Sequence, residues 1–308
     1  MFSRMRRLAV VLFVALFFVS SSLAQTTTLR VMGWNMQGNG DDIDPQLLVK
    51  QLGIKQGVDI WGLSEVRPEL FDDFLDGAKI GEKDEFAIIQ GETGRNIRLA
   101  IIYNKSQLDL IESDELLKLF ELKKGSSLRA PLTARFRGKT TKQEFVFMVN
   151  HLASGNAADN EKQAKALAAW VKTQTLPVIN VGDLNSFDKR PVINILKETW
   201  FELEPIHNVP SFAKPLSGRI DHIFIGNRDK AIGWSGTAAI FKRESDELAV
   251  GPFTDTKATT DHQPIGATFT ISNVKPPPID DDDEERLIQQ LLRRLDRLEE
   301  RVRQLEKK

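Results

Sequence analysis

The chain has 308 residues, 41% of them hydrophobic, which is enough for one large domain or two with a sizeable core. Its 42 basic and 43 acidic residues nearly cancel, and this balance argues against a histone-like or polybasic nucleic-acid binder. An enzyme that meets phosphates locally remains compatible with it. No cysteine is present, which excludes disulfides, thiol nucleophiles and cysteine metal sites.

The first 24 residues have the pattern of a secretory signal peptide. Three arginines precede an unbroken apolar run over residues 8–19, and the small residues Ser22 and Ala24 follow it. The run is shorter than the roughly 20 residues that span a bilayer, which favours a cleaved leader over a permanent anchor. We expect cleavage after Ala24, secretion to the extracellular space or the periplasm, and no stable membrane insertion afterwards.

Strands outnumber helices in the pattern of residues 25–272, which we interpret as one domain. Several connections between strands lack a helix, so an α+β, two-layer β-sandwich flanked by helices is favoured over a doubly wound parallel sheet. The sequence predicts strands over 29–35, 60–65, 86–90, 99–104, 132–137, 144–149, 219–225 and 265–271, a strand with a following turn over 177–186, and helices over 45–56, 68–77 and 160–173.

The chain changes character after residue 272. Residues 273–283 contain three prolines followed by four aspartates, which predicts a stiff and solvated linker. Over residues 284–308, apolar residues recur three and four apart from Ile288 to Leu305, as in a coiled coil. We expect self-association through this C-terminal coiled-coil helix, as a dimer or a trimer. The alternative is a single amphipathic helix docked on the domain.

Polar side chains gather where the apolar strands end. They supply carboxylates for a hard divalent cation, amides that orient oxygen ligands, and imidazoles that titrate near neutral pH. This inventory fits metal-assisted hydrolysis. Zinc is less natural, because cysteine is absent and the histidines are scattered. The residues concerned are Asn35, Glu65, Asn150, His151, Asp183, Asn185, Asp221, Asp261 and His262.

Residues 177–186, Pro-Val-Ile-Asn-Val-Gly-Asp-Leu-Asn-Ser, carry the central motif. Alternation along a strand puts Asp183 and Asn185 on the same face. A turn also favours Asp, Asn and Gly for conformational reasons alone, so this stretch by itself leaves both interpretations open. His222 follows Asp221 directly and therefore points to the opposite face, which predicts a packing or hydrogen-bonding role; His207 is expected in a loop.

Taken in order, the motifs resemble those of the endonuclease/exonuclease/phosphatase superfamily, which contains deoxyribonuclease I and the exonuclease III type AP endonucleases. The resemblance covers residues 29–271. The motifs are Trp-Asn at 34–35, Ser-Glu-Val at 64–66, Asn-His-Leu at 150–152, Gly-Asp-Leu-Asn-Ser at 182–186, Arg-Ile-Asp-His-Ile-Phe at 219–224 and Thr-Asp-His-Gln-Pro-Ile at 260–265.

The resemblance implies a metal site and the ion that fills it. Glu65 matches the metal-binding glutamate of the family, with Asn35 and Asp261 near the same ion. Mg²⁺ is the expected metal, and Mn²⁺ and Ca²⁺ are the alternatives.

The resemblance also implies catalytic roles. Asp183 and Asn185 match the pair that handles the attacking water and the scissile phosphate. His262 matches the catalytic histidine and Asp221 the acid that orients it, while His151 matches the second histidine of the deoxyribonuclease I branch. Either His262 or Asp183 would deprotonate the water, and His151 would protonate the leaving oxygen.

Two further segments resemble the deoxyribonuclease I branch. Arg129-Ala130-Pro131 matches its Arg-x-Pro segment and assigns Arg129 to the substrate phosphate, together with Asn150; an ordinary solvated loop arginine is the alternative. Gly94-Arg95-Asn96 recurs, but the tyrosine and glutamate that follow it in that branch are absent. No carboxylate partner of His151 is therefore identified.

Three functions follow from these observations. The leading one is a secreted, divalent-metal-dependent phosphodiester hydrolase, a nuclease acting on DNA or RNA. The second is the same chemistry on a phospholipid or a sugar phosphate, as in the sphingomyelinase branch, and the near-neutral charge permits it. The third is a non-catalytic, secreted, oligomeric binding protein.

Overall fold

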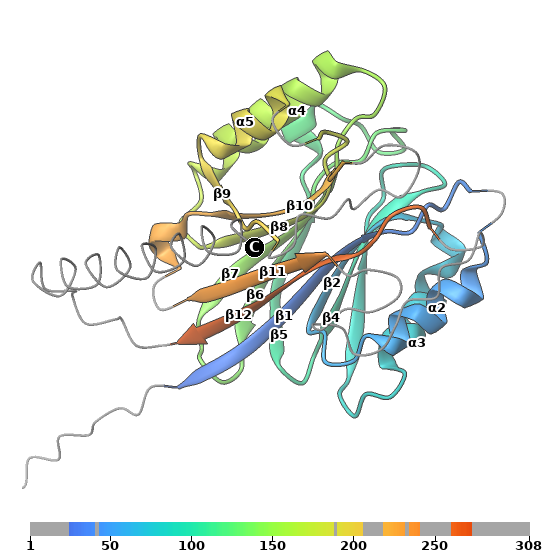
Figure 1. Cartoon of the computed structure of the whole chain (residues 1–308), viewed down its shortest axis with the longest axis vertical. Helices are drawn as coiled ribbons and strands as arrows, with labels where there is room; N and C mark the ends of the chain where they lie inside the picture. Colours follow the sequence, from blue (N-terminus) through green and yellow to red (C-terminus); the bar gives the residue numbers. More distant parts are fainter. Residues whose placement is uncertain are drawn as a thin grey trace, which may run out of the picture.

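The computed structural model describes residues 25–40, 43–187, 190–205, 218–231, 234–240 and 260–272. These residues form two six-stranded sheets that pack face to face (Figure 1). In spatial order, the first sheet consists of β11 (Ser235–Ile240), β12 (Ile265–Ser272), β1 (Thr26–Asn35), β2 (Ile60–Val66), β4 (Arg98–Asn104) and β3 (Phe86–Gln90). The second consists of β5 (Leu108–Glu115), β6 (Leu132–Gly138), β7 (Glu144–His151), β8 (Val178–Asp183), β10 (Asp221–Gly226) and β9 (Trp200–Glu202). The predicted two-layer sandwich is confirmed.

Helices cover the outer face of each sheet (Figure 1). α2 (Pro45–Ile54) and α3 (Phe71–Lys79) lie on the first sheet, and α4 (Ala157–Val171) and α5 (Pro191–Lys197) lie on the second. The sequence predicted the first three. Asp44 caps α2 by accepting a hydrogen bond from the Gln46 amide. Three short 3-10 helices complete the described elements: η1 (Pro68–Leu70), η2 (Leu117–Phe120) and η3 (Arg228–Lys230).

The hydrophobic core lies in three layers, one between the sheets and one under each pair of helices. The sheets approach closely at Gly62, where an added Cβ would lie 2.5 Å from Cγ2 of Val181 and 3.1 Å from the Phe147 ring. Because side chains in such a core already pack at crystal-like density, a larger residue at position 62 would push the two sheets apart.

The sequence prediction missed three of the described strands, β5, β9 and β11, together with α5 and the 3-10 helices η2 and η3. The strand β5, Leu-Asp-Leu-Ile-Glu-Ser-Asp-Glu, lies at the edge of its sheet and is mostly exposed. Its sequence therefore lacks the alternation of apolar and polar residues by which a half-buried strand is predicted. The strands and helices that the sequence predicted are found within a few residues of their expected bounds.

Some predictions lie outside the described residues. These are the signal peptide, the linker over 273–283, the coiled coil over 284–308, and His207. Among the helices that the structure describes, none combines the length and apolar character needed to cross a membrane.

The topology brings distant segments to one end of the sandwich. β1 runs parallel to β2, and β7 runs parallel to β8, so the polar residues that follow these strands emerge together. β10 runs antiparallel to β8 and starts at this same end, with Asp221 opposite Asp183. The segment before β12 arrives here as well, because β12 is antiparallel to β1.

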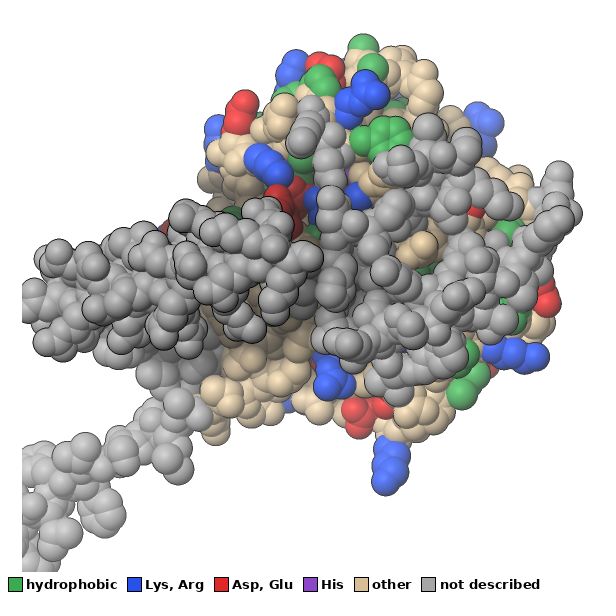
Figure 2. All heavy atoms as spheres, in the orientation of Figure 1, with side chains coloured by type: hydrophobic (Ala, Val, Ile, Leu, Met, Phe, Trp, Pro, Cys, Tyr) green, Lys and Arg blue, Asp and Glu red, His purple; other side chains and the backbone are tan. Residues whose placement is uncertain are grey.

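Charges of both signs are interspersed over the described surface in view in Figure 2. Basic and acidic side chains both occur around the part of this face that the structure describes. This agrees with the near-neutral composition.

Candidate active site

A cavity of about 300 Å³ opens at the end of the sandwich where these strands meet. Seven of the residues predicted from the sequence line it, and the other lining residues are Gln37, Ser154, Phe187 and Ile220. Of the remaining predicted residues, Asp221 lies behind His262, Arg129 lies beside Glu65, and Asn150 lies elsewhere. The seven are Asn35, Glu65, His151, Asp183, Asn185, Asp261 and His262.

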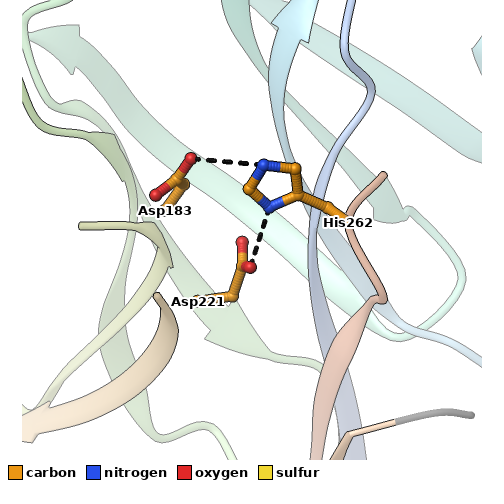
Figure 3. Close-up of side chains that lie close together, drawn as sticks. All are labelled: Asp183, Asp221 and His262. Carbon is orange, nitrogen blue, oxygen red and sulfur yellow. Dashed lines mark hydrogen bonds and ion pairs between the residues drawn. The ribbon is translucent and has the colours of Figure 1, made fainter. Parts of the chain in front are cut away.

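Asp183, Asp221 and His262 form a buried triad (Figure 3). His262 Nδ1 lies 2.9 Å from Asp221 Oδ2, and His262 Nε2 lies 3.7 Å from Asp183 Oδ2. Burial alone would lower the pKa of His262, but Asp221, Asp183 and Asp261 outweigh it and raise the pKa to about 10. His262 is therefore an imidazolium at neutral pH.

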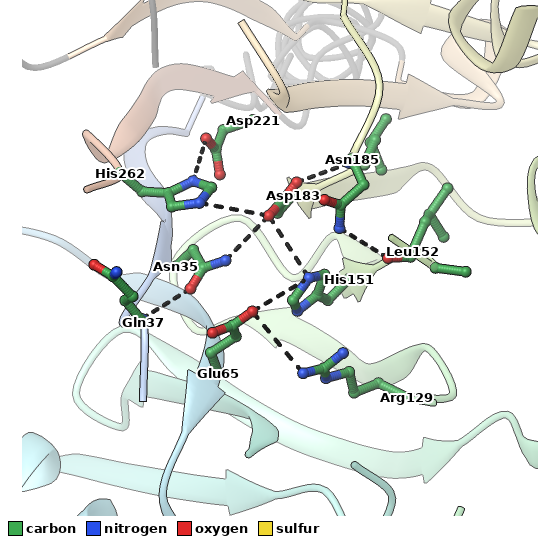
Figure 4. Close-up of polar contacts among 12 residues, drawn as sticks. Asn35, Gln37, Glu65, Arg129, His151, Leu152, Asp183, Asn185, Asp221 and His262 are labelled. Atoms are coloured by element: carbon green, nitrogen blue, oxygen red, sulfur yellow. Dashed lines mark hydrogen bonds and ion pairs between the residues drawn. The ribbon is translucent and has the colours of Figure 1, made fainter. Parts of the chain in front are cut away.

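Asp183 is held by amides on both of its oxygens. Its Oδ1 accepts from the Asn185 backbone amide at 2.7 Å, and its Oδ2 accepts from Asn35 Nδ2 at 3.0 Å (Figure 4). Burial raises the pKa of Asp183 to about 7, with Asp221 adding to the rise and the His262 charge opposing it. This carboxyl group can therefore exchange a proton near neutral pH.

Asn185 is fixed in an unusual backbone conformation. Its φ of 48° lies in the left-handed region, which asparagine tolerates better than most residues. Its side-chain Nδ2 donates to the Leu152 carbonyl at 2.9 Å (Figure 4). The segment after β7 and the segment after β8 are thereby tied together beside Asp183.

Glu65 reaches the cavity through a bulge in β2. The pairing of β2 with β4 shifts register between Leu63 and Val66, and Glu65 has a positive φ of 55°. Such a conformation costs about 1–3 kcal/mol in a residue with a Cβ and is typical of functional sites. Glu65 Oε1 lies 3.6 Å from His151 Nε2 and 3.9 Å from Arg129 (Figure 4).

His151 is neutral at pH 7. Burial lowers its pKa well below the usual 6.5, and the charges of Arg129 and His262 add to this shift. Its Nε2 faces the cavity, 3.6 Å from Asp183 Oδ2, while its buried Nδ1 has no hydrogen-bond partner among the described residues.

Two residues assigned to substrate phosphate occupy different positions. Arg129 is 9% exposed beside Glu65, and its segment is fixed because the Ala130 amide donates to Thr93 Oγ1 at 2.9 Å. Asn150 has no exposed surface, and its Nδ2 donates to Asn180 Oδ1 at 2.7 Å. Asn150 therefore lies in the sheet, away from the cavity lining.

The cavity has the chemistry to hold a hard cation. Four carboxylates, those of Glu65, Asp183, Asp221 and Asp261, meet only two cationic groups, Arg129 and His262, among the described residues around it. An excess of buried negative charge with oxygen donors suits a divalent ion such as Mg²⁺.

Two sets of side chains are candidates for holding that ion. Ligand atoms of Asp183, Asp221 and His262 all lie within 4.8 Å of one another and could hold an ion together. As long as His262 is protonated, however, it offers no lone pair. The second set is Glu65 with Asn35 and Asp261, which line the same cavity. Its carboxylate at Glu65 is easier for an ion to reach, because 18% of the Glu65 side chain is exposed against 2% for Asp183.

Gln37 and Thr260 were not identified from the sequence, yet both fix the loop that carries Asp261 and His262. Gln37 Oε1 accepts from the Asp261 amide at 2.7 Å, and Thr260 Oγ1 donates to the Asn35 carbonyl at 2.8 Å. The signal available in the sequence was their position, two residues after Asn35 and directly before Asp261.

Glu202 was also missed, and it supports the site from behind. It accepts from Arg219 at 2.7 Å and pairs with His222 Nδ1 at 2.8 Å, so it binds the residues on both sides of Asp221. His222 Nε2 contacts the Ser186 carbonyl at 3.2 Å, which confirms its predicted hydrogen-bonding role. Although burial opposes it, hydrogen bonds from His222 and Lys197 lower the pKa of Glu202 to about 2.

Comparison with solved structures identifies the fold. No protein-family model matches the chain, and no curated protein matches it in sequence. An endonuclease/exonuclease/phosphatase family protein from Bacteroides thetaiotaomicron superposes with a TM-score of 0.62 at 17% identity, over 80% of this chain and 99% of that one. The chain has the endonuclease/exonuclease/phosphatase fold.

Two other proteins with this fold illustrate its range. D. rerio TDP2 complexed with single strand DNA product has a TM-score of 0.60 at 19% identity, over 79% of this chain and 99% of that one. A mannosyl-6-phosphatase from Bacteroides thetaiotaomicron has a TM-score of 0.57 at 17% identity, over 78% and 99%. The endonuclease/exonuclease/phosphatase fold thus accommodates different phosphate esters.

Replacing Glu202 by glutamine should destabilise the protein at pH 7 by about 2 kcal/mol, because Arg219 and His222 lose a buried anionic partner. The pKa of Glu202 is depressed in the folded state, so its contribution is complete above the ordinary value of 4.5 and is lost as the pH falls toward 2. Urea unfolding of both proteins across this range measures the difference.

The matched control is Glu204→Gln, since Glu204 also meets Lys197, at 3.4 Å, but its side chain is 70% exposed. An equal loss of stability in the two variants would refute the supporting role of Glu202.

Proposed function

We propose that the chain is a divalent-metal-dependent phosphodiester hydrolase of the endonuclease/exonuclease/phosphatase type and acts as a nuclease on DNA or RNA. The observation that carries the proposal is the buried Asp183 carboxyl, placed between the His262 imidazolium and the Asn35 amide in an acidic cavity. TDP2, which shares the fold, is known with a single-stranded DNA product.

The protonation states support one assignment of the proton transfers. His262 carries a proton at neutral pH and so cannot accept one from water, whereas Asp183, with a pKa of about 7, can. We therefore assign Asp183 as the general base, with Asn35 and the Asn185 amide orienting its two oxygens. The sequence left Asp183 and His262 open as the base, and these protonation states favour Asp183.

Positive charge then stabilises the phosphoryl group as the reaction proceeds. His262 and Arg129 lie on opposite sides of Asp183 and Glu65, where they can meet the oxygens on which negative charge develops. Because His151 is neutral, it would donate a hydrogen bond from Nε2 to the leaving oxygen. It would not act as a cationic acid that protonates this oxygen before the ester bond breaks.

The metal site that we propose is centred on Glu65, with Asn35 and Asp261 beside it. These residues line the same cavity and offer the oxygen ligands that Mg²⁺ prefers, with Mn²⁺ and Ca²⁺ as alternatives. When bound, the ion would neutralise charge on the phosphate oxygens.

Hydrolysis of a phospholipid or sugar phosphate is the second candidate. The near-neutral composition permits it, because an extended duplex would profit from a basic stripe. The mannosyl-6-phosphatase with this fold acts on a sugar phosphate, as its name states. A non-catalytic binding protein is the least economical candidate, because it would not require a buried, charged and strained constellation.

Purified protein with Mg²⁺ should cleave plasmid DNA or RNA, and a chelator should abolish the cleavage. Asp183→Asn removes the base and should lower kcat/KM by about 10²–10⁴-fold. The exposed Asp229→Asn is the control and should match the wild type, since Asp229 pairs only with Lys230 in the described structure. Hydrolysis of sphingomyelin or a sugar phosphate in place of both nucleic acids would establish the second candidate; full activity in Asp183→Asn would refute the site.

We further propose that the chain is exported with cleavage after Ala24 and self-associates through residues 284–308. Deleting residues 284–308 should leave hydrolysis intact and reduce the mass in solution from that of a dimer or trimer to that of a monomer, as measured by light scattering. An unchanged mass would eliminate the coiled-coil proposal, and an N-terminal sequence of the secreted protein that starts before residue 25 would eliminate the predicted cleavage.

A further inference from the structure

A second cavity, of about 620 Å³, adjoins the catalytic one. Both cavities are lined by Asn185 and Phe187, so they meet at the segment that follows β8. The second cavity extends from there between the first turn of α4 and the start of α5, two helices that pack side by side on the second sheet (Figure 1). A group attached to a phosphate in the catalytic cavity could enter it directly.

The wall between the cavities is an aromatic ring with a defined position. Phe187 is half-buried and packs where a side chain at position 218 would lie, because an added Cβ on Gly218 would overlap its ring. The ring is therefore supported from one side by backbone. Its placement leaves it at the lining of both cavities.

The amides in this cavity are already engaged in the fold. Asn156 caps α4 by accepting from the amides of Ala158 and Asp159. Asn160 donates from Nδ2 to the carbonyls of Ala153 and Leu184, at 2.7 and 3.0 Å. The engaged atoms shape the cavity, whereas Asn160 Oδ1 is buried without a hydrogen-bond partner among the described residues and can accept from a ligand.

Among the described residues, Glu161 and Arg190 are the charged ones in the lining, one of each sign. Together with the Ser186 hydroxyl they offer an acceptor, a planar donor and a small polar group to whatever enters. Arg190 is exposed at the rim and stays hydrated, but Glu161 is half-buried, and an acyl chain packed against it would leave its carboxylate without a hydrogen bond on that side, which is unfavourable. A flat heterocycle with a polar edge would supply that hydrogen bond.

We propose that this cavity binds the nucleoside esterified to the scissile phosphate, with its base stacked on Phe187 and its polar edge toward Glu161 and Arg190. The inference rests on the proposed function and narrows its substrate. A base that enters this cavity cannot also be paired and stacked in a duplex, so the substrate is single-stranded or has an unpaired nucleotide at the cleavage site.

Fluorescence of 2-aminopurine deoxyribonucleoside 5′-monophosphate gives a readout that does not need turnover. Stacking on an aromatic ring quenches this base, so the wild type should quench it on binding, and Phe187→Ala should weaken binding by about tenfold. Phe201→Ala is the matched control, because Phe201 is 43% exposed on β9 and lines neither cavity. No binding to the wild type, or equal weakening in both variants, would overturn the proposal.

Turnover of three p-nitrophenyl phosphodiesters identifies the group that the cavity selects. The thymidine ester should have a higher kcat/KM than the methyl ester, and Phe187→Ala should reduce this ratio about tenfold. Gly218→Ala should reduce it as well, since its methyl group displaces the Phe187 ring. An equal loss of preference for the glucose 6-phosphate ester would show a sugar subsite and overturn the nucleoside assignment.

The two measurements separate this proposal from the proposed function. Quenching without hydrolysis of any ester would refute the hydrolase while leaving the nucleoside subsite standing. Hydrolysis of all three esters with ratios unaffected by Phe187→Ala would leave the hydrolase standing and refute the subsite.

Discussion

The buried ion pair between His262 and Asp221 is the interaction on which the site depends. It joins the two sheets, because His262 precedes β12 of the first sheet and Asp221 begins β10 of the second. Neither charge could be buried alone without a cost of several kcal/mol. The pair therefore places an imidazolium within 3.7 Å of Asp183, at the end of the sandwich where both sheets deliver polar side chains.

The two acidic groups beside His262 are equally buried but differ in their contact with the imidazolium. Asp221 receives the imidazolium Nδ1 hydrogen bond directly, at 2.9 Å. Asp183 is desolvated and only faces the cation, so its pKa rises to about 7. Glu65, brought in by a strained bulge from the first sheet, completes an acidic cavity with less burial. One arrangement of strands thus brings together the proposed base, a fixed cation and the carboxylate proposed to bind the metal ion.

The sequence predicted seven of the residues that line the candidate active site, but not the residues that hold them in place. Asp183 ends an apolar strand and His262 belongs to one of the ordered motifs, so both could be inferred from the sequence. Alternation along the strand was sufficient to predict that His222 points to the face opposite to Asp221. Glu202 pairs with residues 17 and 20 positions away, and Phe187 separates two cavities. Such contacts depend on tertiary packing, and no local pattern encodes them. Asn150 was assigned to the substrate phosphate, but alternation along β7 puts its side chain on the face opposite to His151, where it contacts Asn180.

The most direct test of this account is the protonation state of His262, read from its imidazole ¹⁵N shifts in the metal-free protein between pH 5 and pH 11. The account predicts an imidazolium at neutral pH that loses its proton only near a pKa of about 10, and an Asp221→Asn variant in which that pKa falls by several units. A neutral His262 imidazole at pH 7 in the wild type would contradict the ion pair, and with it the assignment of Asp183 as the base.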